Sequence, residues 1–539
     1  MSQERYLIDA ISVSPSQGET EALNVVKKRL DKLGISSGDY ELSIFKKSVD
    51  ARKRQDVRLV YSVAVSSVNG KRLPQKAVDK LNVRRIQTAQ IKFEYGEREM
   101  SERPMVVGMG PAGMFCALIL AEQGYRPIII DRGDCVSDRV LAVDRFYSDG
   151  KLDTDSNIQF GAGGAGTFSD GKLLTRINDE KCSYVLDTFK KFGAPEDITL
   201  KAKPHIGTDI LRVVVDNILR RIEELGGEVI YRCKMTNITE LSDGNIKVTT
   251  TKGDFVCGDI VLALGHSARD TYRMLIEKGF SISPKPISVG VRIEHLRDDI
   301  ENMLYGDFAG HPALGAAEYA LSDTKRERGV YTFCMCPGGE VVGAASEEDS
   351  VVVNGMSKYA RDGRNSNSAI AVSVRPDDFE AHEGSIALGA IEFQRKIERA
   401  AFAAGGRNYS APMQTVGDFL SGKRGSMPSK VTPTYMGGKC AVADMNDVLP
   451  EFVTEHLKYG IQSFDRRYCG FADESAILTG AETRTSAPVR ILRTENMSAI
   501  GHSAIYPCGE GAGYAGGITS AAVDGIKTAV AIIKKYKKI

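Results

Sequence analysis

The sequence predicts an α/β fold that combines a domain built on buried strands alternating with helices, an inserted α+β domain and a small α+β module at the N-terminus. Three observations predict it. Residues 104–131 contain a short apolar strand, a glycine loop, a helix and a second strand, in that order. A further glycine loop precedes the last helical segment of the chain. Between them, the region 284–479 is rich in strand patterns.

The composition is that of a globular protein of several domains. Its 539 residues exceed the size at which a single core stops growing, roughly 250 to 300 residues. Lys and Arg number 71 and Asp and Glu 70, so no global charge attracts nucleic acid or a membrane. The start of the chain lacks the pattern of a signal peptide, and no apolar run is long enough for a membrane span. Ten cysteines without a Cys-x-x-Cys pair indicate free thiols, so we expect a cytoplasmic protein without a metal site.

The first hundred residues, 1–100, are expected to form a separate α+β module. Strand and helix patterns alternate along it. It contains a basic run, made up of Lys46, Lys47, Arg52, Lys53 and Arg54. A solvated surface is the simplest interpretation of this run, and a surface for RNA or for a redox partner protein is the alternative. The polar segment that ends at Pro104 is expected to be a linker.

The first glycine loop carries the strongest functional signal. Gly108, Gly110 and Gly113 fit the pattern G-x-G-x-x-G between a strand and a helix, and Asp131 ends the next strand. Gly108 permits a tight turn, Gly110 lets the backbone approach a pyrophosphate, and Gly113 lets the helix pack on the strand. The helix N-terminus adds free N–H groups for phosphate. Because the Asp131 carboxylate suits ribose hydroxyls and repels a 2′-phosphate, FAD or NAD is favoured over NADP.

Two other segments fit the same pattern in different surroundings. Residues 161–166 are followed by turn formers, so we expect an irregular loop there, placed against a ring or phosphate or at the plain surface. Residues 511–516 are followed by a single helix, and the chain leaves no room for the second strand of a unit of about 30 residues. This last loop is therefore expected to complete the site that the first loop begins.

These segments together resemble a known family. The first glycine loop with its acid, the "DIVLALG" strand and the late "YPCGEGAGYAGG" loop are similar to the Rossmann-like FAD-binding domain of two-dinucleotide-fold flavoproteins. "FGAGGAGTFSDGKL", "LRVVVDNILRRIEELGGEV" and "ETRTSAPVRILR" resemble signatures of the uncharacterised bacterial FAD-dependent dehydrogenases. The resemblance covers essentially the whole chain. It implies FAD as the cofactor and leaves the substrate open.

The resemblance also implies which residues hold FAD. Asp131 would take the adenosine ribose, Arg132 would flank the adenine, and Glu510 would meet the ribityl chain or a phosphate. The expected set is Gly108, Gly110, Pro111, Ala112, Gly113, Asp131, Arg132, Gly163, Gly164, Gly166, Gly265, Gly509, Glu510, Gly516, Gly517 and Ile518. The FAD-binding domain would comprise 101–283 and 480–539, with an inserted substrate domain at 284–479 between its two parts. We expect the substrate site where the two domains meet, and a hairpin turn at 337–339.

Three residues near the expected flavin are candidates for catalysis: Glu482, Arg484 and Tyr514. Arg484 has two interpretations, a carboxylate ligand for the substrate or a structural partner of Glu482. His266 and His502 are candidate acids or bases, although a structural role is the simpler interpretation of each.

Cys334 and Cys336 lie two residues apart in a strand pattern. Strand alternation would point Cys334 and Cys336 to one face, where buried structural thiols are favoured over a redox pair. No second loop has the surroundings of a nucleotide site, so we expect no dedicated NAD(P)H site, and a transient reaction of NAD(P)H at the flavin face stays open. We expect an FAD-dependent oxidoreductase that transfers a hydride between the flavin and a small organic substrate. An RNA-associated flavoprotein that uses the basic module is the alternative.

Overall fold

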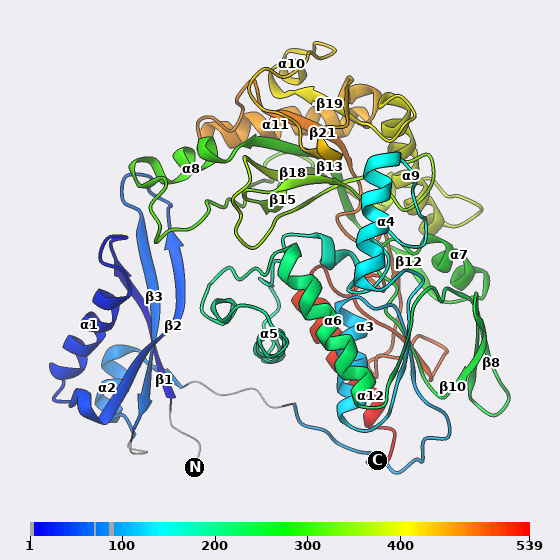
Figure 1. Cartoon of the computed structure of the whole chain (residues 1–539), viewed down its shortest axis with the longest axis horizontal. Helices are drawn as coiled ribbons and strands as arrows, with labels where there is room; N and C mark the ends of the chain where they lie inside the picture. The colour runs from blue at the N-terminus through cyan, green and yellow to red at the C-terminus, as the bar shows by residue number, and fades with distance from the viewer. Residues whose placement is uncertain (1–4, 69–71, 86–90) are drawn as a thin grey trace.

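A computed structural model describes residues 5–68, 72–85 and 91–539 of the chain. The expectation about the start of the chain rests in part on residues 1–4, which lie outside the described residues. The N-terminal module stands to one side of the molecule, and the remaining chain forms a lower body with an upper layer of strands and helices (Figure 1). None of the helices within the described ranges is long and apolar enough to cross a membrane.

The N-terminal module is a four-stranded antiparallel sheet with two helices, which gives the α+β composition that its sequence predicts. Its strands are arranged in the order β2-β3-β1-β4. Ala22, Val26 and Leu30 recur at helical spacing and are buried, which explains why α1 packs on the sheet. Its elements are β1 (Arg5–Val13), α1 (Gly18–Asp31), β2 (Tyr40–Asp50), β3 (Arg58–Ser67), α2 (Gln75–Leu81) and β4 (Arg84–Arg85).

The lower body contains a five-stranded parallel sheet, in the order β23-β11-β5-β6-β7. These strands are β5 (Met105–Val107), β6 (Ile128–Ile130), β7 (Glu228–Ile230), β11 (Ile260–Leu262) and β23 (Ile505–Pro507). The late strand β23 pairs with β11, which in turn pairs with β5. The last glycine loop therefore belongs to the same sheet as the first, as the sequence predicts.

Helices cover one face of this sheet and a strand meander covers the other. Helices α3 (Pro111–Glu122), α6 (Thr208–Glu224) and α12 (Ile518–Ile533) lie side by side (Figure 1). A side chain at Gly525 would overlap the carbonyl oxygen of Ala112, so α3 and α12 approach closely. The meander is β8 (Met235–Glu240), β9 (Ile246–Thr250) and β10 (Gly253–Cys257). The domain also contains α4 (Val136–Asp149), α5 (Lys181–Lys191) and α7 (Arg269–Glu277).

The inserted domain is built on a seven-stranded sheet, in the order β14-β15-β18-β13-β21-β19-β20. Its strands are β13 (Ile287–Leu296), β14 (Ser322–Asp323), β15 (Val330–Cys336), β18 (Asn365–Val374), β19 (Ala411–Thr415), β20 (Cys440–Val442) and β21 (Ile477–Glu482). Its helices are α8 (Arg297–Tyr305), α9 (Ile386–Ala404), α10 (Val416–Ser421) and α11 (Glu451–Arg467). Two short pairs join β16 (Glu340–Gly343) to β17 (Val353–Met356), and β12 (Ile282–Pro284) to β22 (Val489–Ile491). Across the part of the chain that the structure describes, 3-10 turns lie at Ser37–Asp39, Gly164–Phe168, Glu196–Thr199, Gly306–Phe308, Pro376–Asp378, Tyr435–Gly437 and Met445–Asp447.

The structure corrects two expectations about this domain. The turn at 337–339 does not form a hairpin, because β15 pairs with β14 and β18, whereas β16 pairs with β17. Strand β21 runs across the expected boundary at 479/480, so the sheet of the inserted domain includes Glu482. The sequence of a buried apolar strand contains no signal for a domain boundary. The predicted boundary at 479/480 therefore fell inside β21.

Candidate cofactor and substrate site

One cavity of about 660 Å³ lies where the parallel sheet meets the sheet of the inserted domain. Its walls include the loops that follow β5, β11 and β23, at the carboxyl edge of the parallel sheet, which is where ligands bind in such folds. The segment 164–172 forms a further part of the wall. Side chains of β13, β15, β18 and β21 face it from the inserted domain.

The first glycine loop has the geometry that its sequence predicts. A side chain at Gly108, whose φ is +105°, would overlap the carbonyl oxygen of Ala263, and one at Gly113 would overlap the carbonyl oxygen of Gly108. A Cβ at Gly110 would meet nothing closer than the Cα of Gly164, at 3.9 Å. Gly108 and Gly113 therefore shape the protein, whereas Gly110 leaves room for a ligand in the cavity.

Asp131 lines the cavity with its carboxylate held by backbone donors. Oδ2 accepts a hydrogen bond from the Met109 N–H at 2.9 Å, and Oδ1 accepts one from the Gly133 N–H at 2.8 Å. Each oxygen keeps a lone pair for a ribose hydroxyl. Arg132 lies in an adjoining small pocket, where its guanidinium stacks 4.3 Å from the Phe160 ring centre and pairs with Asp270 at 2.8 Å.

The last glycine loop forms the opposite wall, at the N-terminus of α12. Gly516 and Gly517 have nothing within 4 Å of an added Cβ, so both border open space. Glu510 lines the same wall, and burial raises its pKa to about 7, although Lys285 partly opposes the change. Of the expected cofactor residues, Gly108, Gly110, Pro111, Ala112, Asp131, Gly164, Gly166, Gly265, Glu510, Gly516, Gly517 and Ile518 line the cavity.

The other expected cofactor residues support the walls. Gly113 lies under the first loop, and an added Cβ at Gly509 would lie 2.6 Å from that of Ala112. At Gly163, whose φ is +80°, a side chain would overlap the hydroxyl of Thr167. Glycines of these loops thus divide into those that face the ligand space and those that allow protein segments to pack.

Glu482 faces the cavity but pairs with an arginine that sequence analysis missed. Its carboxylate accepts from Nε and Nη2 of Arg292 at 2.7 and 3.0 Å, and Arg292 is fully buried. Arg292 also donates to Asn367 and to the carbonyl of Cys334, at 2.8 and 3.0 Å. The suggested pairing of Arg484 with Glu482 is therefore wrong.

Arg484 instead belongs to a second buried cluster, centred on Glu398 of α9. Its Nε and Nη2 donate to the Glu398 carboxylate at 3.1 and 2.9 Å, and Nη1 donates to the hydroxyls of Ser267 and Ser346. Arg269 binds the same carboxylate at 2.7 Å. Burial disfavours the Glu398 anion, but the two arginines outweigh it and hold its pKa below the ordinary value. The guanidinium fork of Arg484 is thus already occupied, which argues against bidentate binding of a substrate carboxylate.

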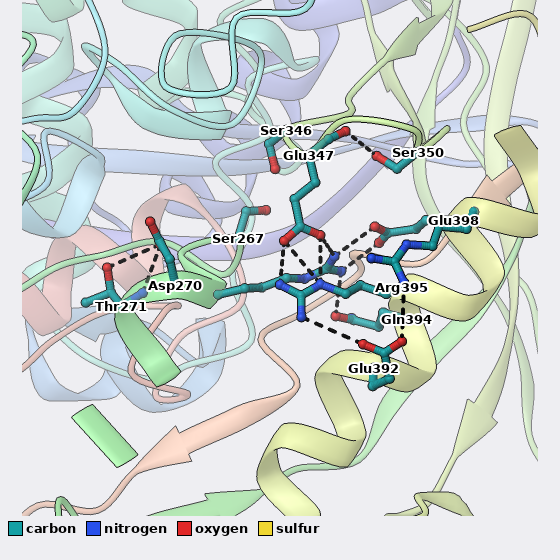
Figure 2. Close-up of polar contacts among 12 residues, drawn as sticks. Ser267, Asp270, Thr271, Ser346, Glu347, Ser350, Glu392, Gln394, Arg395 and Glu398 are labelled. Carbon is teal, nitrogen blue, oxygen red and sulfur yellow. Dashed lines mark hydrogen bonds and ion pairs between the residues drawn. The ribbon is translucent and has the colours of Figure 1, made fainter. Parts of the chain in front are cut away.

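Figure 2 shows how α9 extends this cluster. Glu398, Gln394 and Arg395 project from α9 toward Glu347, and Arg395 pairs with Glu347 at 2.6 Å. Burial opposes ionisation of Glu347, yet Arg395 and Arg269 lower its pKa to about 2. The ion pairs of this cluster link Glu347 and Glu398 of the inserted domain to Arg269 of the parallel-sheet domain.

Tyr514 and His502 lie away from the cavity. Tyr514 is absent from its lining; the guanidinium of Arg493 stacks 3.7 Å from the Tyr514 ring centre, and the Tyr514 hydroxyl accepts from the Arg493 N–H at 3.2 Å. His502 stacks on Phe280 at 4.1 Å and pairs with Glu240. The expectation that Tyr514 lies beside the ring is therefore wrong, because the loop turns it outward.

His266 does line the cavity. Burial, together with the positive charges of Arg484 and Arg269, lowers its pKa to about 3. It is therefore neutral at pH 7, and its Nδ1 lies 3.0 Å from the Ser267 hydroxyl. A neutral imidazole there can donate or accept one hydrogen bond, but it is not a general acid.

Cys334 and Cys336 both line the cavity, although a bulge interrupts β15 between Phe333 and Cys336. Cys334, whose φ is +42°, is exposed to the cavity, whereas Cys336 is buried. The Cys336 thiol donates to the Cys334 carbonyl at 3.1 Å, and burial raises its pKa to about 12. Both thiols are free. The bulge had no signal in the sequence.

The basic run of the N-terminal module lies in part against the body. The Lys47 N–H donates to the Leu200 carbonyl at 2.6 Å, and the Lys47 carbonyl accepts from the Ala202 N–H at 2.8 Å. Arg54 packs beside Gly306, and Arg52 pairs with Asp50 at 2.6 Å. Lys46 and Lys53 are exposed. No contact here tests RNA or protein binding, which stays a prediction.

Comparison with known proteins identifies the family. A curated protein of Clostridium beijerinckii, described as an uncharacterized protein, is 48% identical over 523 residues, which cover 95% of this chain and 96% of that protein. The model of the family "FAD-dependent protein, C-terminal domain-like" matches residues 286–485. The chain belongs to this FAD-dependent protein family. A domain of unknown function matches residues 8–66.

Solved structures that match this member of the FAD-dependent family have low sequence identity and low TM-scores. CtdE in complex with FAD is 10% identical with a TM-score of 0.32 and covers 81% of this chain and 84% of its own. NikD, described as an unusual amino acid oxidase, is 12% identical with a TM-score of 0.33 and covers 80% of this chain and 94% of its own. At this sequence identity and TM-score, the ligand or activity of neither protein is transferred to this chain.

The cavity fits FAD, the cofactor of this family. Gly110, Gly516 and Gly517 leave open space where any side chain would intrude, and all three lie next to helix N-termini that suit phosphate. Asp131 is available to a ribose at the end of β6. The volume of about 660 Å³ lies within the range of cofactor sites.

Proposed function

We propose that this protein is an FAD-dependent oxidoreductase that transfers a hydride between the flavin and a small organic substrate in the cavity between its two domains. The main support is that one cavity extends from the glycine loop at Gly110 to Cys334 and Glu482 in the sheet of the inserted domain. FAD supplies the redox chemistry when it is bound. The substrate would then lie between the cofactor and β13, β15 and β21.

In this proposal the residues of the chain position the reactants and exclude water. Gly110 and the N-terminus of α3 would hold the pyrophosphate, and Asp131 the adenosine ribose. The N-terminus of α12 would place a positive dipole next to the electron-rich end of the cofactor. The ion pairs of Arg292 with Glu482 and of Arg484 with Glu398 make the side of the cavity toward the inserted domain polar, and each buried charge there has a partner. The electron donor or acceptor is left open, and NAD(P)H is one candidate, reacting without a site of its own.

The first test measures the cofactor and the reaction separately. The purified protein should show flavin absorbance, or gain it on incubation with FAD. Anaerobic mixing with a panel of amines, hydroxy acids, dienes and NAD(P)H should then bleach the flavin for some members of the panel. A protein that neither carries nor binds FAD would overturn the proposal, and one that binds FAD but reacts with nothing would refute the enzymatic part.

The RNA-associated alternative remains a prediction about the N-terminal module. Its test is RNA binding at low salt that weakens as salt rises, because phosphate contacts release counterions. Replacing Lys46 and Lys53, which are exposed, with Gln should abolish that binding. A protein that binds no RNA at low salt would eliminate it.

A further inference from the structure

The charges that line the cavity differ in how fully they are paired. Asp170 is bound through two bonds by Arg361, and Glu482 by Arg292. Arg484 is bound by Glu398. These side chains meet in bidentate pairs, which leave little free charge for a ligand.

Lys172 is different. Its ammonium donates to a neutral acceptor, the carbonyl of Met335, and lies 3.8 Å from the nearest carboxylate oxygen, that of Glu318. Glu318 is already bound by Arg361 at 2.7 Å, and Lys203 lies 3.7 Å from it. An ammonium has three donors, so Lys172 keeps donors for a ligand in the cavity that it lines.

Among the lining cations of the described chain, Arg375 also makes no hydrogen bond from its guanidinium to a carboxylate. Its side chain is 52% exposed and its guanidinium donates to the Glu327 carbonyl, so it lies at the rim. The Lys172 side chain is 32% exposed and bridges from the body to the inserted sheet. It is therefore the interior cation that faces the substrate half of the cavity.

The bulge in β15 places further groups beside this ammonium. The two carbonyls of the bulge, those of Cys334 and Met335, accept from Arg292 and Lys172 respectively, so a cation holds each one in place. The Cys334 thiol is consequently turned into the cavity next to Lys172. Phe333, the residue before the bulge, adds apolar surface to the lining.

We propose that Lys172 is an anion subsite for the carboxylate of a small substrate with an apolar body. This inference rests on the proposed function and specifies its substrate class. The carboxylate would receive a charge-assisted hydrogen bond from the ammonium, while the apolar part packs against Phe333. A single ammonium suits one carboxylate group.

The test uses benzoate and acetate as probes on the FAD-loaded protein, with benzamide and acetamide as neutral counterparts. Binding is followed by the change in flavin absorbance. We expect the acids to bind more tightly than the amides, and Lys172→Met to weaken acid binding at least tenfold while amide binding is unchanged. Lys172→Arg should restore most of the affinity. Lys203→Met is the matched control, because Lys203 shares Glu318 but does not line the cavity.

A second readout does not depend on the flavin signal. Bound benzoate should slow the alkylation of Cys334 by iodoacetamide, measured by mass spectrometry, while the exposed Cys469 outside the cavity lining reacts at an unchanged rate. Equal affinity for acids and amides, or an equal loss in Lys203→Met, would overturn the subsite. Absence of FAD from the wild-type protein would instead overturn the proposed function, so the two failures are distinguishable.

Discussion

At the scale of single residues, the glycines of the motif G-x-G-x-x-G have two roles: some allow close packing of the backbone, and one leaves space for a ligand. Gly108 and Gly113 are in contact with backbone, whereas Gly110 borders the open cavity. A side chain at Gly108 or Gly113 would strain the protein, and a side chain at Gly110 would fill space meant for a ligand. The motif G-x-G-x-x-G thus contains positions that can be tested independently.

Gly110→Val should abolish FAD retention without unfolding the protein. Its Cβ would have no protein atom closer than 3.9 Å, so the fold tolerates it, but the side chain would occupy the pyrophosphate position. Flavin absorbance and circular dichroism of the purified variant measure the two effects. Gly113→Val is the comparison, and it should lower the melting temperature because it collides with the Gly108 carbonyl. Retention of FAD by Gly110→Val would contradict our placement of the cofactor.

Glu510→Gln should change how the stability of the cofactor-free protein depends on pH. Burial raises the pKa of Glu510 from 4.5 to about 7, so the folded protein binds this proton more tightly than the unfolded chain does. The stabilising effect of the protonated form is therefore lost as pH rises from about 4.5 through 7. Relative to Glu510→Gln, the wild-type protein should become less stable over that window and show a constant difference above it. Melting temperatures at several pH values measure the difference, and a pH-independent difference would refute the shifted pKa.

At the scale of elements, α9 connects the two domains through charge as well as packing. Its apolar residues Ala387, Leu388 and Ile391 pack with the parallel-sheet domain, and Glu398 binds Arg269 and Arg484. Breaking such a buried cluster by removing one partner is costly, since the remaining charges stay buried without compensation. The helix therefore fixes the cavity wall that includes Arg484.

Glu398→Ala should destabilise the protein strongly, by about 3 to 5 kcal/mol, the range for a buried pair that loses one partner. Thermal unfolding measured with and without FAD should show the loss in both states. Glu380→Ala removes an exposed carboxylate, whose pair with Lys396 at 3.4 Å lies in solvent, and should change the melting temperature little. Similar effects of the two substitutions would show that the buried cluster contributes nothing specific.

At the scale of the whole molecule, patterns that repeat along the chain were predictable and contacts between distant segments were not. The parallel-sheet unit, the late loop at 509–517 and the module at the N-terminus all follow from local periodicity and glycine spacing. The partners of Glu482 and Arg484 lie in other segments, at Arg292 and Glu398, and no spacing indicates them. Lys172 was missed for the same reason, because its hydrogen-bond partner, the Met335 carbonyl, lies in β15 of the inserted domain. The folded chain brings these residues together only through its tertiary contacts.

The docking of the N-terminal module is the least expected feature of the assembled chain. The backbone of Lys47, in the edge strand β2, pairs with residues 200–202 of the body through two hydrogen bonds. The body segment also holds Lys203, which lies near the Glu318 cluster behind the cavity. The module is therefore joined to the wall of the site through backbone pairing at one edge.

Lys47→Pro should loosen this contact and leave the cofactor in place. Proline removes the N–H that Lys47 donates to the Leu200 carbonyl, and the ladder to β3 does not use that N–H, because it points to the body. Hydrogen exchange measured by mass spectrometry should become faster in peptides that cover 40–50 and 197–203. Lys47→Ala keeps the N–H and should exchange as the wild type does. Because none of the module's described residues (5–68, 72–85 and 91–100) lines the cavity, FAD content should be equal in all three proteins. A loss of FAD in Lys47→Pro alone would show that docking of the module supports the cofactor site.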